Sequence, residues 1–191
     1  MNNRFARIAA ATLAAAALTA CTQHTARDAE STTIQEDKPT MDLAQLPTLK
    51  QTRDQMLELI FAVQREVARQ VPATAPWAWH YEYQTSACET DGLKLYFPKL
   101  GSPHGLTDDE WAQTLPAVTR LAAAAGLMHV GGAGQNTSGN HDARISSDDG
   151  RELVFAAREA TLITASVGCR RSADVDLWVD GRIPNPPDPQ P

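Results

Sequence analysis

The residues of this chain best suited to chemistry are His141 and Asp142, which follow Asn140. An imidazole beside a carboxylate could act as a general base or supply ligands to a metal. We expect residues 141–146 to form a strand, however, and successive side chains of a strand point to opposite faces of a sheet. We therefore favour a structural role, in which Asn140 or Asp142 shapes the turn. A hydrolase or metal-dependent enzyme that uses His141 and Asp142 is the alternative.

Other motifs that would identify an enzyme do not occur in the sequence. Gly131-Gly132-Ala133-Gly134 is a poor phosphate-binding loop, because no G-K-[ST] follows it and the next element is expected to be a strand. His80 and His104 are isolated, and there is no G-x-S-x-G, H-E-x-x-H or S-x-x-K. The sequence therefore predicts a protein that is not an enzyme and has no cofactor and no metal site.

The first twenty residues have the features of a lipoprotein signal peptide. Arg4 and Arg7 precede a short apolar run, and residues 18–21 read Leu-Thr-Ala-Cys, which matches a lipobox. We expect cleavage before Cys21 and attachment of diacylglycerol and an amide-linked palmitate to Cys21, which would anchor the protein in a membrane of the cell envelope. An ordinary secretory signal or an uncleaved anchor is the alternative, and the membrane face stays open.

The two remaining cysteines, Cys88 and Cys169, are about 81 residues apart. In an exported protein such a pair favours a disulfide, which on the chain-entropy model is worth roughly 4.5 kcal/mol. A redox or metal site is the alternative. It is disfavoured because the sequence has no C-x-x-C and no histidine at ligand spacing around either cysteine.

The charge of the mature chain excludes one class of partner. Of the 17 lysines and arginines, removal of Arg4 and Arg7 leaves 15 against 23 acidic residues, so the net formal charge is −8. Phosphate backbones repel a chain of this charge. We therefore expect no nucleic-acid partner, and take an envelope protein, a glycan or a lipid as the possible partners besides the membrane.

Composition divides the chain into four parts. Residues 1–20 are the signal peptide, and residues 21–47 are a polar stretch that we expect to be a flexible tether behind the lipidated Cys21. Residues 48–171 hold the periodic apolar patterns of one globular domain. Residues 172–191 contain D-G-R-I-P-N-P-P-D-P-Q-P, which predicts an extended, exposed, proline-rich tail.

Two amphipathic helices are expected in the domain. Thr48 and Gln51 fit a capping box that opens a helix with an apolar stripe ending at Val71. Thr107 and Glu110 fit a second capping box, whose helix runs towards Gly126. Pro116 predicts that this second helix either kinks or begins anew near that residue.

Strands fill the rest of the domain. Residues 77–83 and 93–97 predict a hairpin around Thr90-Asp91-Gly92, and four further strands are expected at 127–133, 141–146, 152–156 and 161–168, with a turn at Asp149-Gly150. The order is therefore α-β-β-α-β-β-β-β. This order predicts an α+β two-layer sandwich, in which an antiparallel sheet of about five to six strands has both helices on one face.

A row of four aromatic residues, Trp77, Trp79, Tyr81 and Tyr83, alternates along the first strand. We expect these rings to share one face of the sheet and to form the floor on which the helices pack. The alternative is a groove for a glycan, a lipid or a partner, because Trp and Tyr combine apolar area with a hydrogen-bonding edge. Trp178 is a separate candidate for an exposed contact.

Several motifs together resemble the LppA family of small bacterial lipoproteins. They are the lipobox, a helix ending in V-P, W-x-W before a cysteine and D-G, L-T-D-D-E-W, A-A-A-G-L, G-N-H-D and T-A-S-V-G-C-R. The resemblance covers most of residues 48–171 and leaves out the tail. It implies a surface lipoprotein with paired cysteines and implies no reaction. We expect a lipid-anchored envelope protein that acts as a non-enzymatic binding or interaction module. The alternatives are the enzyme above and a carrier with an apolar cavity between helices and sheet.

Overall fold

The structure is a computed structural model that describes residues 42–88, 91–131, 137–171 and 177–189. These residues belong to one compact unit, Pro39–Pro191. The predicted signal peptide, Cys21 and most of the predicted tether, up to residue 41, lie outside the described residues. Within the described part, no helix combines the length and apolarity needed to cross a bilayer.

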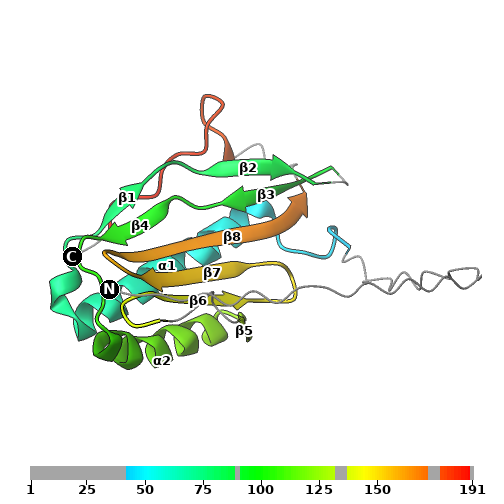
Figure 1. The fold of residues 1–191 in the computed structure, drawn as a ribbon. Helices are drawn as coiled ribbons and strands as arrows, with labels where there is room; N and C mark the ends of the chain where they lie inside the picture. Colours follow the sequence, from blue (N-terminus) through cyan, green and yellow to red (C-terminus); the bar gives the residue numbers. More distant parts are fainter. Residues whose placement is uncertain (1–41, 89–90, 132–136, 172–176, 190–191) are drawn as a thin grey trace, which may run out of the picture. The chain divides into compact units, whose positions relative to one another are not determined.

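Each of the two long helices is followed along the chain by four strands (Figure 1). In order they are α1 (Leu49–Gln70), η1 (Pro72–Thr74), β1 (Ala78–His80), β2 (Gln84–Ala87), β3 (Gly92–Tyr96), β4 (Lys99–Ser102), α2 (Asp108–Ala124), β5 (His129–Gly131), β6 (His141–Ser146), β7 (Glu152–Ala157) and β8 (Thr161–Arg171).

The strands form one antiparallel sheet of eight strands in the order β1-β4-β8-β7-β6-β5, with β2 paired to β3 and β3 paired to β8. The α+β fold class is confirmed, but the strand count is higher than the predicted five to six. The reason is that two long strands are interrupted. Tyr81 has a φ of 69° and separates β1 from β2, while Phe97 and Pro98 separate β3 from β4.

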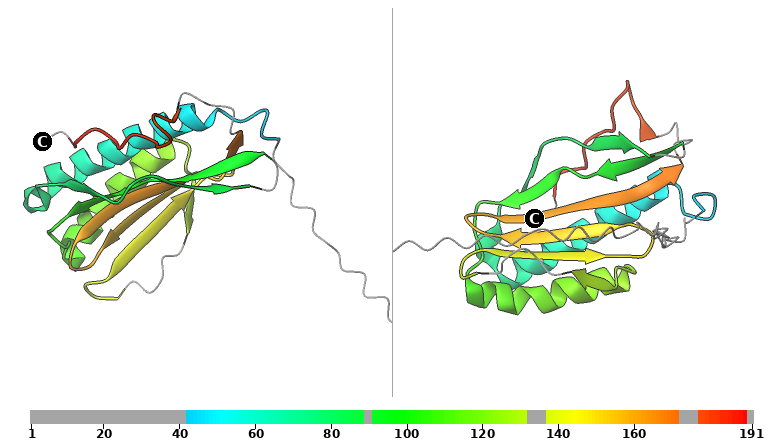
Figure 2. Two further views of the ribbon diagram at one scale, coloured as in Figure 1. Left: turned by 90° about the horizontal axis from the view of Figure 1, so that it is seen from above. Right: turned by 45° about the vertical axis from the view of Figure 1, so that its right-hand side comes forward.

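Both helices lie on the same face of the sheet, as the view from above shows (Figure 2), and they contact each other. The core lies between these two layers, and its fully buried side chains include Met56, Ile60 and Val63 of α1, Val118 of α2, and Leu100, Ile145, Phe155 and Ile163 of the sheet. No described helix covers the opposite side of the sheet, which is called the uncovered face below.

Both helices begin at the predicted capping boxes. The Thr48 hydroxyl accepts a hydrogen bond from the Gln51 N–H at 3.2 Å, and the Gln51 side chain accepts one from the Thr48 N–H at 3.1 Å. The second helix repeats the arrangement: Thr107 Oγ1 accepts from the Glu110 N–H at 3.3 Å, and Glu110 accepts from the Thr107 N–H at 2.8 Å.

Replacing either capping threonine with alanine is expected to lower the free energy of unfolding by about 1 kcal/mol, because an N–H of the first helical turn loses its acceptor. Urea denaturation of Thr48→Ala and Thr107→Ala measures this change. Thr48→Ser and Thr107→Ser keep the hydroxyl and should stay within about 0.5 kcal/mol of the native chain. A serine variant as unstable as its alanine counterpart would contradict the assignment.

Pro116 lies inside α2, which is continuous from Asp108 to Ala124. A residue other than proline at position 116 would donate its N–H to the Ala112 carbonyl. Neither Pro116 nor Ala112 is buried. Water can therefore hydrogen-bond this carbonyl, which lowers the cost of a proline inside the helix. The predicted restart of the helix near Pro116 is wrong.

One end of the sheet carries a disulfide between its strands and a buried ion pair whose arginines reach the helices. The predicted Cys88–Cys169 disulfide is present and links the β2–β3 hairpin to β8. Beside it, Arg170 is completely buried and donates to Asp149 Oδ2 at 2.8 Å and to the Asp149 carbonyl at 2.9 Å. Arg151 binds the same carboxylate at 2.9 Å and donates to the Ala125 carbonyl at the end of α2.

The proline-rich tail departs from its prediction. Leu177 and Ile183 are buried in the core cluster, and the Trp79 indole N–H donates to the Pro187 carbonyl at 2.9 Å. The predicted exposure of the tail is therefore wrong at Leu177 and Ile183, since their side chains supply apolar area that the domain buries. Trp178 is partly exposed, and Val179 pairs with Arg182 across a tight turn.

Candidate functional site

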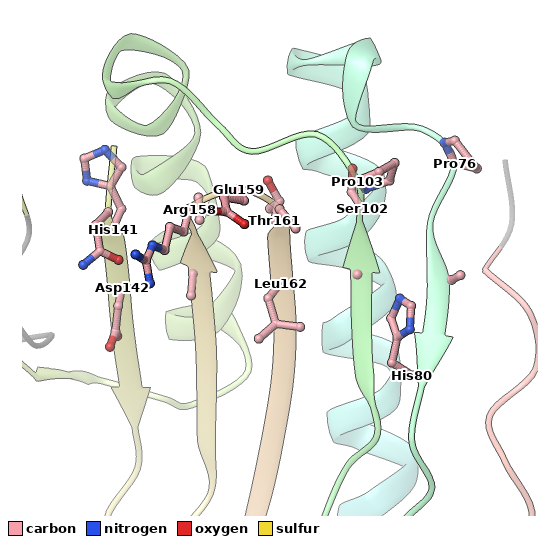
Figure 3. A pocket seen from close by; sticks show the side chains of 16 residues that line it. Pro76, His80, Ser102, Pro103, His141, Asp142, Arg158, Glu159, Thr161 and Leu162 are labelled. Atoms are coloured by element: carbon pink, nitrogen blue, oxygen red, sulfur yellow. The ribbon is translucent and has the colours of Figure 1, made fainter. Parts of the chain in front are cut away.

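His141 and Asp142 occupy the first two positions of β6 and point apart (Figure 3). His141 is buried on the helix side of the sheet, whereas Asp142 is half-buried on the uncovered face. The prediction that neighbouring strand positions separate these side chains is confirmed. A base assisted by its neighbouring carboxylate is therefore not formed by this pair.

The acid that contacts His141 is Asp108, in the first turn of α2. His141 Nε2 lies 2.8 Å from Asp108 Oδ1, and the same carboxylate accepts hydrogen bonds from Ser138 Oγ at 2.6 Å and from the Gly139 N–H at 2.8 Å. The His141 ring stacks on Trp111 at 5.0 Å between ring centres. We call these five residues the Asp108 cluster.

The order of groups in the Asp108 cluster differs from that of a nucleophilic triad. In a triad the imidazole stands between the carboxylate and the hydroxyl, so that it can take the hydroxyl proton. Here the carboxylate stands between Ser138 and His141 and accepts from both. The cluster therefore ties the turn before β6 to the start of α2, and this geometry does not activate Ser138.

The Asp108 cluster makes this turn sensitive to acid. Hydrogen bonds from Ser138, the Gly139 N–H and His141 lower the pKa of Asp108 from its ordinary 3.8 to about 2. Because the folded-state pKa is depressed, the cluster contributes its full stability above the unfolded pKa, and this contribution is lost as the pH falls through the folded pKa. We expect faster hydrogen exchange at the Gly139 amide as the pH falls from 3.8 towards 2, after correction for the intrinsic pH dependence of exchange.

Asp108→Asn is the control for this prediction, because it removes the titrating carboxylate. Exchange at Gly139 should already be fast in this variant at neutral pH, and its corrected rate should change little between pH 4 and 2. Equal acid sensitivity in the native chain and in Asp108→Asn, followed by NMR at the Gly139 amide, would assign the transition to another group.

The described residues hold no group of three or more His, Cys, Asp and Glu side chains placed to bind a metal ion. His104 pairs with Glu110 at 3.1 Å, and His129 pairs with Asp148 at 2.8 Å. His104, His129 and His141 are thus each joined to a single carboxylate, on the surface or at a helix start. This arrangement supports local tethering of loops.

The four aromatic residues of the first strand do not share one face. Trp77 is buried, and Trp79 and Tyr83 pack partly buried against the core, with Trp79 5.9 Å from the Phe61 ring of α1. Tyr81 is 72% exposed, and Lys99 Nζ lies 5.3 Å from the centre of its ring. The predicted alternation is therefore wrong at Tyr81, because its positive φ turns the backbone out of the strand conformation.

A groove of about 770 Å³ lies at the end of the sheet where β6 and β8 begin and β7 ends. Figure 3 shows the side chains that line it. They are Pro76, Ala78, His80, Gly101, Ser102, Pro103, Asn140, His141, Asp142, Ala156, Ala157, Arg158, Glu159, Ala160, Thr161 and Leu162. The volume is within the range of small-molecule sites, roughly 300–1,000 Å³.

The floor of the groove is a single row of residues that runs across five strands on the uncovered face. The register pairs Ala78 with Gly101, Gly101 with Leu162, Leu162 with Ala156, and Ala156 with Asp142. Four of the five side chains are small or apolar and uncharged. The hollow therefore arises because small residues from strands far apart in sequence meet in one row.

The charged rim of the groove is the turn between β7 and β8. A Cβ on Gly105 would lie 2.0 Å from the Arg158 carbonyl oxygen, so only glycine allows this close approach of the preceding loop. Thr161 Oγ1 donates to the His104 carbonyl at 2.7 Å and holds the same loop from the other side. This packing places Arg158 and Glu159, both exposed, beside the floor.

His80 lies at the other end of the floor. A Cβ on Gly101 would be 3.0 Å from His80 Cδ2, so the imidazole ring rests against the bare backbone of β4. Most of the groove went unrecognised in the sequence: Ala78, Gly101, Ala156 and Leu162 carry no chemical motif. Asp108 was likewise missed as the partner of His141, because 33 residues separate them and Asp108 also fits the acidic first turn of a helix.

Comparison with known proteins gives a family and a fold. The family described as "LppA: Lipoprotein confined to pathogenic Mycobacterium" matches residues 22–173. A crystal structure of a DUF4853 family protein from Actinomyces odontolyticus is similar with a TM-score of 0.55 and 12% identity, over 75% of this chain and 80% of that one.

The crystal structure of the putative lipoprotein LppA from Mycobacterium tuberculosis is similar with a TM-score of 0.51 and 12% identity, over 72% of this chain and 86% of that one. No curated protein matches the chain. At 12% identity these two structures support the fold alone, while the family match spans the whole described sheet. The chain belongs to the LppA family of lipoproteins.

Proposed function

We propose that this lipoprotein is a non-enzymatic ligand-binding protein of the cell envelope, and that it binds its ligand in the groove on the uncovered face of the sheet. The observation that carries the proposal is the groove itself. Its floor is mostly apolar, charged groups lie at one end, and the central strands beneath it, β4, β8 and β7, are each paired with a strand on both sides.

The two other candidate functions receive less support. An enzyme built on His141 and Asp142 would need these groups to converge, and they point apart. A carrier with a cavity between helices and sheet would use the helix side, whereas the groove is on the uncovered face. We therefore retain the binding of an apolar ligand from the carrier hypothesis, and propose the uncovered face of the sheet as its site.

Attachment through Cys21 is part of the proposal. The family is a lipoprotein family, and its match begins at residue 22, directly after the cysteine of the lipobox. Lipid on Cys21 would hold the groove near the membrane surface. Cys21→Ala is expected to move the protein from the detergent phase to the aqueous phase in a detergent partition experiment, and unchanged partition would contradict attachment at this residue.

Native mass spectrometry of the protein purified from its own membrane tests the binding role. We expect a co-purifying small molecule with the native chain and none with Ala156→Trp, because the indole fills the middle of the floor without entering the core. Val154→Trp is the matched control, since it is on the same strand and face two residues outside the groove. Absence of any ligand that Ala156→Trp removes would refute the proposed function.

A further inference from the structure

We infer that the groove binds a single extended acyl chain that ends in a carboxylate, with the alkyl part on the floor and the carboxylate at Arg158. This inference rests on the proposed function and names its ligand class. Four features carry it: the chemistry of the floor, its length, the paired state of the strands beneath it, and the position of the cation at its rim.

The floor suits an alkyl chain because it offers contact without hydrogen bonds. Ala78, Ala156 and Leu162 present methyl and isobutyl groups, and the ring of His80 rests on Gly101. Each methylene that leaves water for such a surface gains up to about 0.8 kcal/mol. A groove open to one side gives a part of this gain for each carbon, so affinity should rise steadily with chain length.

The length of the floor limits how far affinity can rise with the length of the alkyl chain. The four uncharged positions in register, from β1 to β7, span three interstrand spacings, or roughly 14 Å at about 4.8 Å each. An extended alkyl chain with carbon–carbon bonds of about 1.5 Å covers this distance with roughly 11 to 12 carbons. Chains longer than this would extend beyond the row of small residues.

An extended peptide fits the same floor poorly. The backbones of β4, β8 and β7 are each paired with a neighbour on both sides, so they offer no donors or acceptors to a chain lying across them. Peptide N–H and C=O groups on the floor would lose water without a replacement partner, at a cost of about 1–3 kcal/mol for each group. The hydroxyls of a glycan meet the same obstacle, and the floor has no broad aromatic ring on which a sugar could stack.

The anionic end follows from Arg158. Among the described residues that line the groove, Arg158 is the one with a permanent positive charge. Its side chain makes no ion pair or hydrogen bond with the described part of the chain. A guanidinium presents a planar fork of N–H donors that matches a carboxylate. The carboxylates of Glu159 and Asp142 also line this end and oppose an anion, so they should weaken its binding.

The test measures binding of dodecanoate and dodecanol, below their aggregation limits, to the mature chain from residue 22 onward without lipid or detergent, by calorimetry. Arg158→Gln should weaken dodecanoate binding about tenfold and leave dodecanol within about twofold. Glu159→Gln should strengthen dodecanoate binding and leave dodecanol unchanged. Both are exposed surface changes, and circular dichroism checks that the variants are folded.

Length and location complete the test. Affinity should rise from octanoate to dodecanoate and little further to tetradecanoate, and Ala156→Trp should abolish binding while Val154→Trp should not. The inference is overturned if dodecanoate does not bind, or if Arg158→Gln and Glu159→Gln change the acid and the alcohol equally. If native mass spectrometry then still finds a different ligand that Ala156→Trp removes, the proposed function stands and only the ligand class fails.

Discussion

Asp149→Ala is expected to lower the free energy of unfolding by about 3 kcal/mol or more, because it leaves Arg170 charged and completely buried without its counter-ion. Burial alone would raise the pKa of Asp149, but hydrogen bonds from Ser147 and Arg151 outweigh it and the pKa is lowered. The carboxylate is therefore ionised at neutral pH. Thermal unfolding should show a fall in melting temperature of about 6 to 12 °C.

Asp148→Ala is the matched control, because its side chain is 89% exposed and pairs with the exposed His129. It should change stability by less than about 0.5 kcal/mol. A second variant separates loss of the pair from loss of packing: Arg170→Met in the Asp149→Ala background removes the unpaired charge and should recover part of the stability. If Asp148→Ala is as harmful as Asp149→Ala, the buried pair is not the cause.

Removing the disulfide with Cys88→Ala and Cys169→Ala together is expected to cost about 2 to 4 kcal/mol. The bond closes a loop with a sequence separation of 81 residues. Its loss therefore frees a long segment of the unfolded chain, which includes all of α2, the five strands β3 to β7 and most of β8. Urea denaturation of the oxidised native chain and of the double variant measures the difference.

Reduction provides the control for the disulfide prediction. Dithiothreitol should lower the stability of the native chain to that of the double variant and should leave the variant itself unchanged. A native chain that keeps its stability when reduced would contradict the prediction. The losses of stability caused by Asp149→Ala and by removal of the disulfide should not be additive. Arg170 Nη1 donates to the Cys169 carbonyl at 3.0 Å, so the two sites share this contact.

Elements that depend on short stretches of sequence were predicted well. The two capping boxes involve residues three positions apart, and both are formed. Strand β6 has the predicted bounds, 141–146, and the turn at Asp149-Gly150 is present with a φ of 82° at Gly150. These signals are reliable because side chains within a turn or along one strand act on their own backbone.

Predictions that assumed an unbroken pattern were less accurate. Trp77 to Tyr83 alternates in sequence as one strand would, but β1 ends at His80, before the positive φ of Tyr81, and β2 begins only at Gln84. Strand β4 was missed, because Lys99-Leu100-Gly101-Ser102 is short and has one large apolar residue. The tail was predicted from its prolines to be exposed, and two apolar side chains among them reach the core.

The sequence by itself determined the fold class, the pairing of Cys88 with Cys169, the starts of both helices and the opposite directions of His141 and Asp142, because each depends on local geometry or on a pair of residues with no other partner. Only the tertiary structure decided that Asp108 meets His141 and that Ala78, Gly101, Ala156 and Leu162 form the floor of one groove.

 Those four floor residues, Ala78, Gly101, Ala156 and Leu162, come from four different strands and meet through the register of the sheet. Register depends on how whole strands pair and how the helices pack over them, which no short segment of sequence encodes.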